Sequence, residues 1–109
     1  MRNTIKNAVA ETVQDLIDSK MKVSFTKKEL DELGIKIPDV YFTAEQIVVI
    51  RKRMNLSQTV FAQILNVSPS SIRQWEQGKR KPSGSTMVLL ELLQKDPMLL
   101  NYRLKTSKA

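Results

Sequence analysis

Apolar residues recur every three or four positions through most of this chain, which is the spacing of one face of an α-helix. The first such stripe extends from residue 3 to about residue 21, and charged or polar residues lie opposite to it. The stripe consists of Ile5, Val9, Val13, Leu16 and Ile17. This pattern predicts an amphipathic helix with one apolar face to bury.

A second, shorter helix is predicted after a connector. Residues 26–29 read Thr-Lys-Lys-Glu, in which the threonine and the glutamate can each bond a free backbone amide of the first turn. Gly34 is expected to end this helix in a left-handed conformation. The following residues look extended, because Pro38 disfavours a helical residue before it. We therefore expect an arm in residues 1–42 and a second domain in residues 43–109.

The second domain begins with three predicted helices that carry clear start and stop signals. A second capping box, Thr-Ala-Glu-Gln, begins at Thr43, and Asn55 is suited to turn the chain out of the first helix. Ser57 and Ser68 are suited to cap the next two helices, since a serine oxygen can accept a hydrogen bond from a free amide. Gly78 is expected to end the third helix.

Two further helices are expected to complete this domain. An apolar helix is predicted from about Ser85 to Gln94, and Asp96 followed by Pro97 indicates the start of a last short helix. Their leucines are candidates for an interface between two copies of the chain, or alternatively for the core of a single copy. These residues are Leu92, Leu93, Leu99 and Leu100.

The composition narrows the range of functions. Hydrophobic residues make up 41% and charged residues 27% of the chain, which is typical of a globular protein in water. No apolar run is long enough to span a bilayer and the N-terminus lacks the apolar core of a signal peptide, so we expect a cytoplasmic protein with no membrane partner. Without cysteine or histidine, the chain lacks a Cys/His zinc site and the usual catalytic constellations that need either residue. We therefore expect no enzyme activity, no metal and no cofactor.

The positive charge is concentrated in the second domain. The chain carries a net charge of +7 at pH 7, yet residues 1–42 hold seven Lys and Arg against seven Asp and Glu. Residues 43–109 hold eleven against four, so the whole excess lies there. A solvated basic face explains a basic chain, but the asymmetry favours a module that binds phosphate groups.

Residues 43–109 also contain several residues that, taken together, match a known sequence pattern. The pattern consists of Leu56-Ser57-Gln58, Phe61-Ala62, the turn Asn66-Val67-Ser68, then Ile72 and Trp75-Glu76-x-Gly78. About residues 44–94 thereby resemble the Cro/repressor family of DNA-binding domains, also called the XRE family. The resemblance implies an all-α fold of five helices, a Cro/repressor-like helix-turn-helix domain preceded by the amphipathic arm. Asn66 stands where many such sequences have glycine, and asparagine tolerates the positive φ of that turn.

By this resemblance, the start of the third helix meets the edges of DNA bases. Arg73 is suited to donate two hydrogen bonds to guanine, and Gln74 is suited to pair with adenine. The serines can contact bases, bond phosphate, or only cap the helix. The expected base-reading residues are Ser68, Ser70, Ser71, Arg73 and Gln74.

The resemblance also assigns phosphate contacts and an internal ion pair. Gln58 matches a glutamine that commonly binds phosphate at a helix N-terminus. The basic loop after the third helix is a second candidate, whose alternative is a merely solvated loop. Arg51 and Glu76 match an internal arginine–glutamate pair, a structural role that we favour over DNA contact for Arg51. Expected phosphate contacts are Ser57, Gln58, Arg53, Lys79, Arg80 and Lys81.

The order of the two parts is similar to that of HigA-type antitoxins of bacterial toxin–antitoxin operons, in which a toxin-binding region precedes an XRE domain. Residues 42–47, 75–82 and 89–97 carry this similarity. It implies a type II antitoxin that neutralises a RelE/HigB-like mRNA-endonuclease toxin, bound by the stripe Ile5, Val9, Val13, Leu16 and Ile17. It also implies a nucleoid-associated homodimer that represses its own operon at a palindromic operator on double-stranded DNA. The alternatives are an N-terminal helix docked on its own domain and a stand-alone repressor with no toxin partner.

Overall fold

The computed structural model describes residues 11, 14–15, 18 and 24–107. The predicted apolar stripe of the arm, Ile5, Val9, Val13, Leu16 and Ile17, lies outside the described residues. The chain divides into two compact units, Met1–Pro38 and Asp39–Ala109.

The first unit contains the short helix α2 (Lys27–Glu32), which begins as the sequence predicts. Thr26 Oγ1 accepts a hydrogen bond from the Glu29 amide at 3.1 Å, and Glu29 Oε1 accepts one from the Thr26 amide at 3.4 Å. The predicted capping box is therefore confirmed. Gly34 adopts a φ of 74°, so the predicted left-handed turn after this helix is also confirmed.

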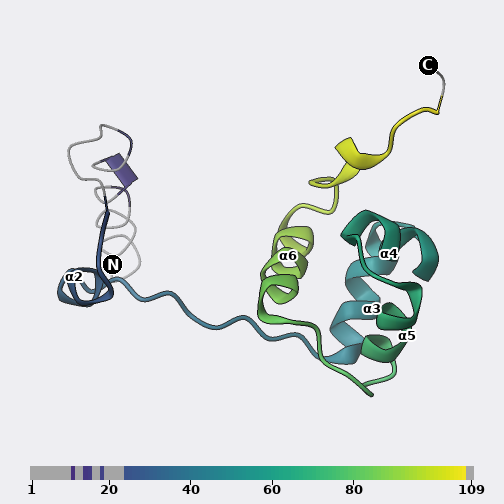
Figure 1. The fold of residues 1–109 in the computed structure, drawn as a ribbon, viewed down its shortest axis with the longest axis horizontal. Coiled ribbons are helices and arrows are strands. Elements are labelled where there is room, and N and C mark those ends of the chain that lie inside the picture. The colour runs from purple at the N-terminus through teal and green to yellow at the C-terminus, as the bar shows by residue number, and fades with distance from the viewer. Residues whose placement is uncertain (1–10, 12–13, 16–17, 19–23, 108–109) are drawn as a thin grey trace. The chain divides into compact units, whose positions relative to one another are not determined.

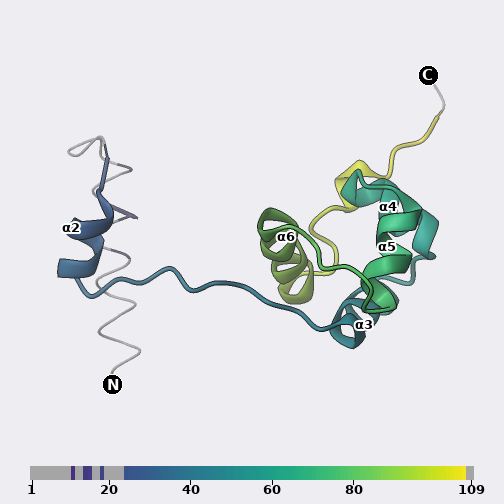
Figure 2. The same ribbon diagram turned by 60° about the horizontal axis from the view of Figure 1, so that its bottom comes forward.

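Within its described residues, the second unit is built of helices alone (Figure 1). In chain order these are α3 (Ala44–Arg53), α4 (Gln58–Leu65), α5 (Pro69–Glu76), α6 (Gly84–Lys95) and the 3₁₀ helix η1 (Asn101–Arg103). The predicted all-α fold with five helices is confirmed. Helix α3 packs against both α5 and α6, and α4 packs against α5 (Figure 2).

Side-chain caps start the helices at the predicted positions. Thr43 Oγ1 accepts from the Gln46 amide at 3.2 Å, and Gln46 Oε1 accepts from the Thr43 amide at 2.8 Å, which forms the capping box of α3. Ser57 caps α4 by accepting from the Val60 amide at 3.2 Å. Each cap bonds an amide that the helix itself leaves without a partner, and removing one typically costs about 1 kcal/mol.

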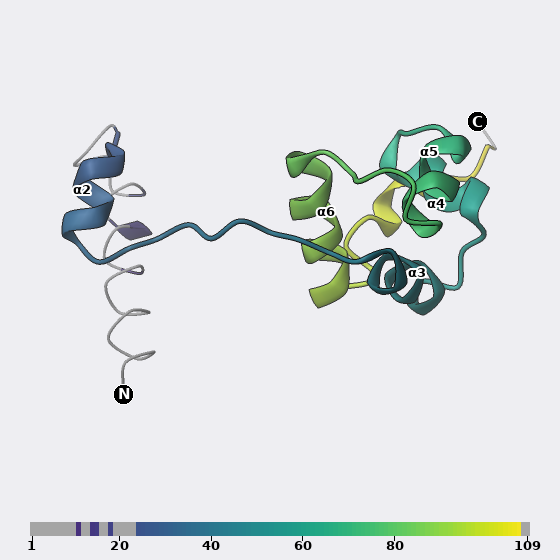
Figure 3. The same ribbon diagram turned by 90° about the horizontal axis from the view of Figure 1, so that it is seen from below.

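The tight turn between α4 and α5 depends on Asn66. This residue adopts φ 58° and ψ 44°, in the left-handed region. The Val67 amide then bonds the Ala62 carbonyl at 2.9 Å, which closes the end of α4. Asparagine serves here because its short polar side chain tolerates this conformation better than most side chains do. The turn lets α5 fold back against α4, as Figure 3 shows from below.

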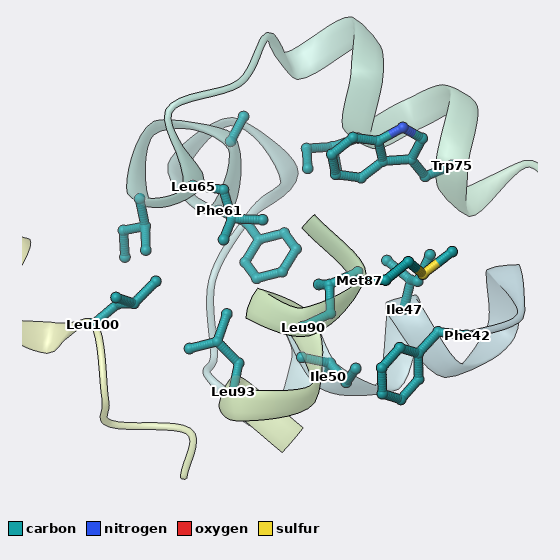
Figure 4. Close-up of a cluster of buried hydrophobic side chains, with 13 residues drawn as sticks. Phe42, Ile47, Ile50, Phe61, Leu65, Trp75, Met87, Leu90, Leu93 and Leu100 are labelled. Atoms are coloured by element: carbon teal, nitrogen blue, oxygen red, sulfur yellow. The ribbon is translucent and has the colours of Figure 1, made fainter. Parts of the chain in front are cut away.

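The core draws side chains from all four α-helices of the second unit and from the residues that flank them (Figure 4). Phe61 of α4, Ile72 of α5 and Leu90 of α6 are fully buried, with 0% of each residue exposed. Trp75 is 5% exposed and belongs to the same core. Phe42, which lies just before α3, is also buried in this cluster. This packing fixes the orientation of α5 relative to its neighbours.

The C-terminal leucines divide into two groups, which corrects part of the predicted dimer surface. Leu93 and Leu100 are 1% and 8% exposed and belong to the core of the single chain, because the last turn folds back onto it. Leu92 and Leu99 are 43% and 39% exposed and remain open to solvent. The predicted last helix is reduced to the 3₁₀ helix η1.

Candidate DNA-binding surface

Helix α5 presents one apolar and one polar face. Ile72 and Trp75 point into the core, whereas Ser70 and Arg73 are exposed and Gln74 is half-buried. Residues three and four positions apart share one face of a helix, so Ser70, Arg73 and Gln74 form a common outward surface. A guanidinium and an amide side by side are the groups that pair with guanine and adenine edges in the major groove.

Two of the three serines assigned to base reading form the start of the helix. Ser68 Oγ accepts a hydrogen bond from the Ser71 amide at 3.1 Å, and the hydroxyls of Ser68 and Ser71 lie 2.9 Å apart. Pro69 occupies the first helical position, where its missing N–H costs nothing. The Ser68 hydroxyl thus caps α5 and is also hydrogen-bonded to the Ser71 hydroxyl, whereas Ser70 lies on the exposed side.

The end of α5 places three basic residues beside it. Gly78 has a φ of 73°, and its amide bonds the Trp75 carbonyl at 3.1 Å. The Lys79 amide bonds the Gln74 carbonyl at 2.9 Å, which completes a Schellman motif. The chain therefore turns sharply, and an exposed basic loop follows, formed by Lys79, Arg80 and Lys81. Exposed cations next to such a helix are suited to contact the DNA backbone.

A largely buried network connects α3, α4 and α5. Arg51 Nε donates to Glu76 Oε2 at 2.7 Å, and Arg51 Nη2 donates to Glu76 Oε1 at 2.9 Å. Their side chains are only 14% and 6% exposed. Arg51 Nη1 also donates to the Leu56 carbonyl at 2.9 Å, and Gln58 Nε2 donates to Glu76 Oε1 at 3.1 Å. The arginine–glutamate pair that the resemblance assigned is thus present, with Gln58 as a further member.

The network shifts the titration of both charged groups. Burial alone raises the pKa of the Glu76 carboxyl, but hydrogen bonds from Arg51 and Gln58 and the nearby positive charges outweigh it, so the pKa is lowered. The hydrogen bond to Glu76 raises the pKa of Arg51 against the opposing effect of burial. Both groups therefore stay charged at neutral pH, which keeps the connection between α3 and α5 intact.

Three of the predicted phosphate contacts have partners within the chain. Gln58 bonds Glu76, and the Ser57 hydroxyl is used in the cap of α4. Arg53 Nη1 donates to the Gln94 carbonyl at 3.1 Å, at the C-terminal end of α6. The structure therefore gives Arg53 a structural partner in α6. The Gln58 amide nitrogen carries a second N–H, so this side chain at the start of α4 remains compatible with donation to a DNA phosphate.

The structure adds Tyr41 to this surface, a residue that nothing in the sequence pattern singled out. Lys81 Nζ lies over the Tyr41 ring, 5.1 Å from its centroid. The two residues are far apart in the sequence, so no helical spacing connects them and only the folded chain brings them together.

Comparison with known proteins identifies the domain that carries this surface. Residues 49–93, which span α4 and α5, match the family described as Helix-turn-helix. These residues therefore form a helix-turn-helix domain of the XRE type. The chain is a DNA-binding transcriptional regulator, and α5 is the second helix of its helix-turn-helix.

Three relatives extend this comparison. The chain is 29% identical over 101 residues to Antitoxin HigA-2 of Vibrio cholerae, which covers 89% of this chain and 93% of that protein. It is 37% identical over 57 residues to Antitoxin MqsA of Escherichia coli, covering 52% of this chain and 44% of that protein. It is 35% identical over 54 residues to the uncharacterized HTH-type transcriptional regulator YiaG of Escherichia coli, covering 50% of this chain and 56% of that protein.

The part of the chain that the structure describes offers neither a metal site nor a membrane-spanning helix. There, no three Asp, Glu, His or Cys side chains gather closely enough to hold a metal ion. No helix among those residues is long and apolar enough to cross a membrane.

Replacing Lys79 with alanine tests the basic loop of the helix-turn-helix domain. We expect weaker binding to every DNA sequence alike, and a slope of log K against log salt that is less steep by about 1 for each phosphate interaction removed. The measurement is a salt titration of binding to a DNA duplex. Lys28→Ala, which removes the same charge from exposed helix α2, is the control and should leave the slope unchanged. An unaltered slope for Lys79→Ala would remove this lysine from the phosphate contacts.

Proposed function

We propose that this protein is the antitoxin of a type II toxin–antitoxin module and a sequence-specific repressor of its own operon. The observation that carries the proposal is the extent of the similarity to Antitoxin HigA-2. It covers 89% of the chain, so it includes residues of the arm as well as the helix-turn-helix domain. A helix-turn-helix domain alone would account for half of that length, as with YiaG.

In this proposal, the two parts of the chain have different partners. The second domain binds operator DNA in the bacterial cytoplasm, at the nucleoid, through the exposed face of α5 and the basic loop 79–81. The arm binds a RelE/HigB-like mRNA-endonuclease toxin through its apolar stripe. That division agrees with the charge distribution, because residues 1–42 have no net charge and residues 43–109 carry the whole excess. We keep residues 1–42 and 43–109 as the proposed functional division.

The repressor is proposed to act as a homodimer. Two recognition helices related by a two-fold axis read half-sites of a palindrome about one helical turn, roughly 34 Å, apart. Leu92 and Leu99 supply exposed apolar surface for such an interface. Leu93 and Leu100 are excluded from it, because they are buried in the core of the single chain.

Co-expression with the product of the adjacent small open reading frame tests the antitoxin role. We expect the two proteins to purify as a complex and the antitoxin to restore growth of cells that produce the toxin. Val13→Asp should abolish both effects, since it places a charge in the predicted apolar stripe. Lys6→Gln, which changes the net charge by the same amount on the predicted polar face, is the matched control.

The opposite results have a defined meaning. If no complex forms and growth is not restored, the antitoxin role is wrong, and a stand-alone repressor remains. If Val13→Asp and Lys6→Gln behave alike, the stripe is not the toxin-binding surface.

A further inference from the structure

Tyr41 and Lys81 join two segments beside the end of helix α5. Lys81 Nζ lies 5.1 Å from the centroid of the Tyr41 ring, within the range of about 6 Å in which a cation is attracted to an aromatic face. Both residues line a cavity of about 70 Å³, together with Phe42, Trp75 and Gly78. The segment before α3 and the loop after α5 thus meet at the same place.

Both partners stand next to anchored residues. Phe42, which follows Tyr41, is 7% exposed and belongs to the core. Pro82, which follows Lys81, is buried as well. The Tyr41 ring itself is exposed, at 59% for the residue. The Tyr41 ring therefore lies on the surface, while its backbone is held in place by the buried residue that follows. Packing of the core does not require an aromatic ring at this position.

We propose that Tyr41 is a positioning residue for DNA binding, whose ring holds the Lys81 ammonium in place to contact a backbone phosphate. The proposal rests on the proposed role of loop 79–81 as a phosphate contact. It adds to the DNA-binding surface a residue that lies outside the matched helix-turn-helix region, residues 49–93.

The physical reason is the flexibility of lysine. The lysine side chain is a long, flexible stem, and ordering its ammonium on a phosphate costs much of that freedom. If an aromatic ring already restricts the lysine side chain in the free protein, less conformational entropy is lost when DNA binds. The ammonium carries three N–H donors, so contact with the ring on one side leaves donors for a phosphate on another.

A salt titration of binding to a DNA duplex of generic sequence tests this inference, because phosphate contacts are independent of sequence. The full chain is compared with Tyr41→Phe, Tyr41→Leu, Lys81→Ala and the double variant Tyr41→Leu/Lys81→Ala. We expect Tyr41→Leu to weaken binding about three- to fivefold and Tyr41→Phe to bind like the parent, since phenylalanine keeps the ring. Lys81→Ala should weaken binding and make the salt slope less steep by about 1 for each phosphate interaction removed.

The double variant separates positioning from an independent effect of Tyr41. Once Lys81 is absent, Tyr41→Leu should cause no further weakening, because the ring then has no cation to hold. The inference is overturned if Tyr41→Leu binds like the parent, or if it weakens binding equally with and without Lys81. It is also overturned if Lys81→Ala leaves the salt slope unchanged.

Failure of the inference is distinguishable from failure of the proposed function. Lys79→Ala on the same generic duplex and Arg73→Ala on the preferred DNA report on the DNA-binding surface without involving the ring. If they weaken binding while the Tyr41 variants do not, only the positioning role is wrong. Thermal unfolding of each variant, followed by its helical circular dichroism, checks that the domain is folded in every titration.

Discussion

Replacing Arg51 with methionine is expected to lower the free energy of unfolding by about 3 kcal/mol. The Glu76 side chain is 6% exposed in the parent, and the change removes its bidentate partner, so that of these hydrogen bonds only the one from Gln58 remains. Methionine preserves most of the buried stem, so a change in packing contributes little. Urea denaturation measures the effect. Lys52→Met, which removes an exposed charge from the same turn of α3, should change stability by less than about 0.5 kcal/mol.

The pH dependence of stability gives the same network a second test. Because folding lowers the pKa of Glu76, its contribution is present above the unfolded value of about 4.3 and is lost as the pH falls through the lowered folded pKa. Arg51→Met should therefore lose less stability than the parent when the pH is reduced from about 5 to about 3. If both proteins show the same loss, the pair is not the source of that stability.

Replacing Arg73 or Gln74 with alanine is expected to weaken binding to the preferred DNA by about 1–3 kcal/mol and to relax the preference at one base position. Both side chains lie on the outward face of α5, where neither contributes to the core. Binding to a panel of single-base variants of the preferred site measures the effect. Gln63→Ala, which removes an exposed glutamine from neighbouring α4, should leave the panel unchanged.

The salt dependence distinguishes base reading from phosphate binding at these positions. A residue that reads a base changes the preference among sequences, whereas one that binds phosphate changes the salt slope for all sequences. If Arg73→Ala altered only the slope, its assignment to base reading would be wrong.

Local signals predicted most of the fold. Thr43 and Ser57 start helices because a side-chain oxygen satisfies a nearby amide, and this needs no information from distant residues. Asn66 takes the left-handed turn for an equally local reason.

Interactions between distant residues were harder to predict. Gln58 occupies the position assigned to phosphate, but packing brings it within 3.1 Å of the Glu76 carboxylate. Arg53 donates a hydrogen bond to a backbone carbonyl at the end of α6. Leu93 and Leu100 are buried in the core of the single chain. Each of these contacts depends on how the helices pack against one another. For the leucines, the sequence alone leaves both places open, since the same apolar residue suits a core or an interface.

Selection of duplexes from a random DNA library by the full chain tests whether the outward face of α5 reads bases. We expect an enriched palindrome whose half-sites lie about one helical turn apart, and for Arg73→Ala a loss of preference at one position in each half-site. A library that shows no enriched sequence, or the same enriched sequence for the parent and Arg73→Ala, would contradict base reading by this helix.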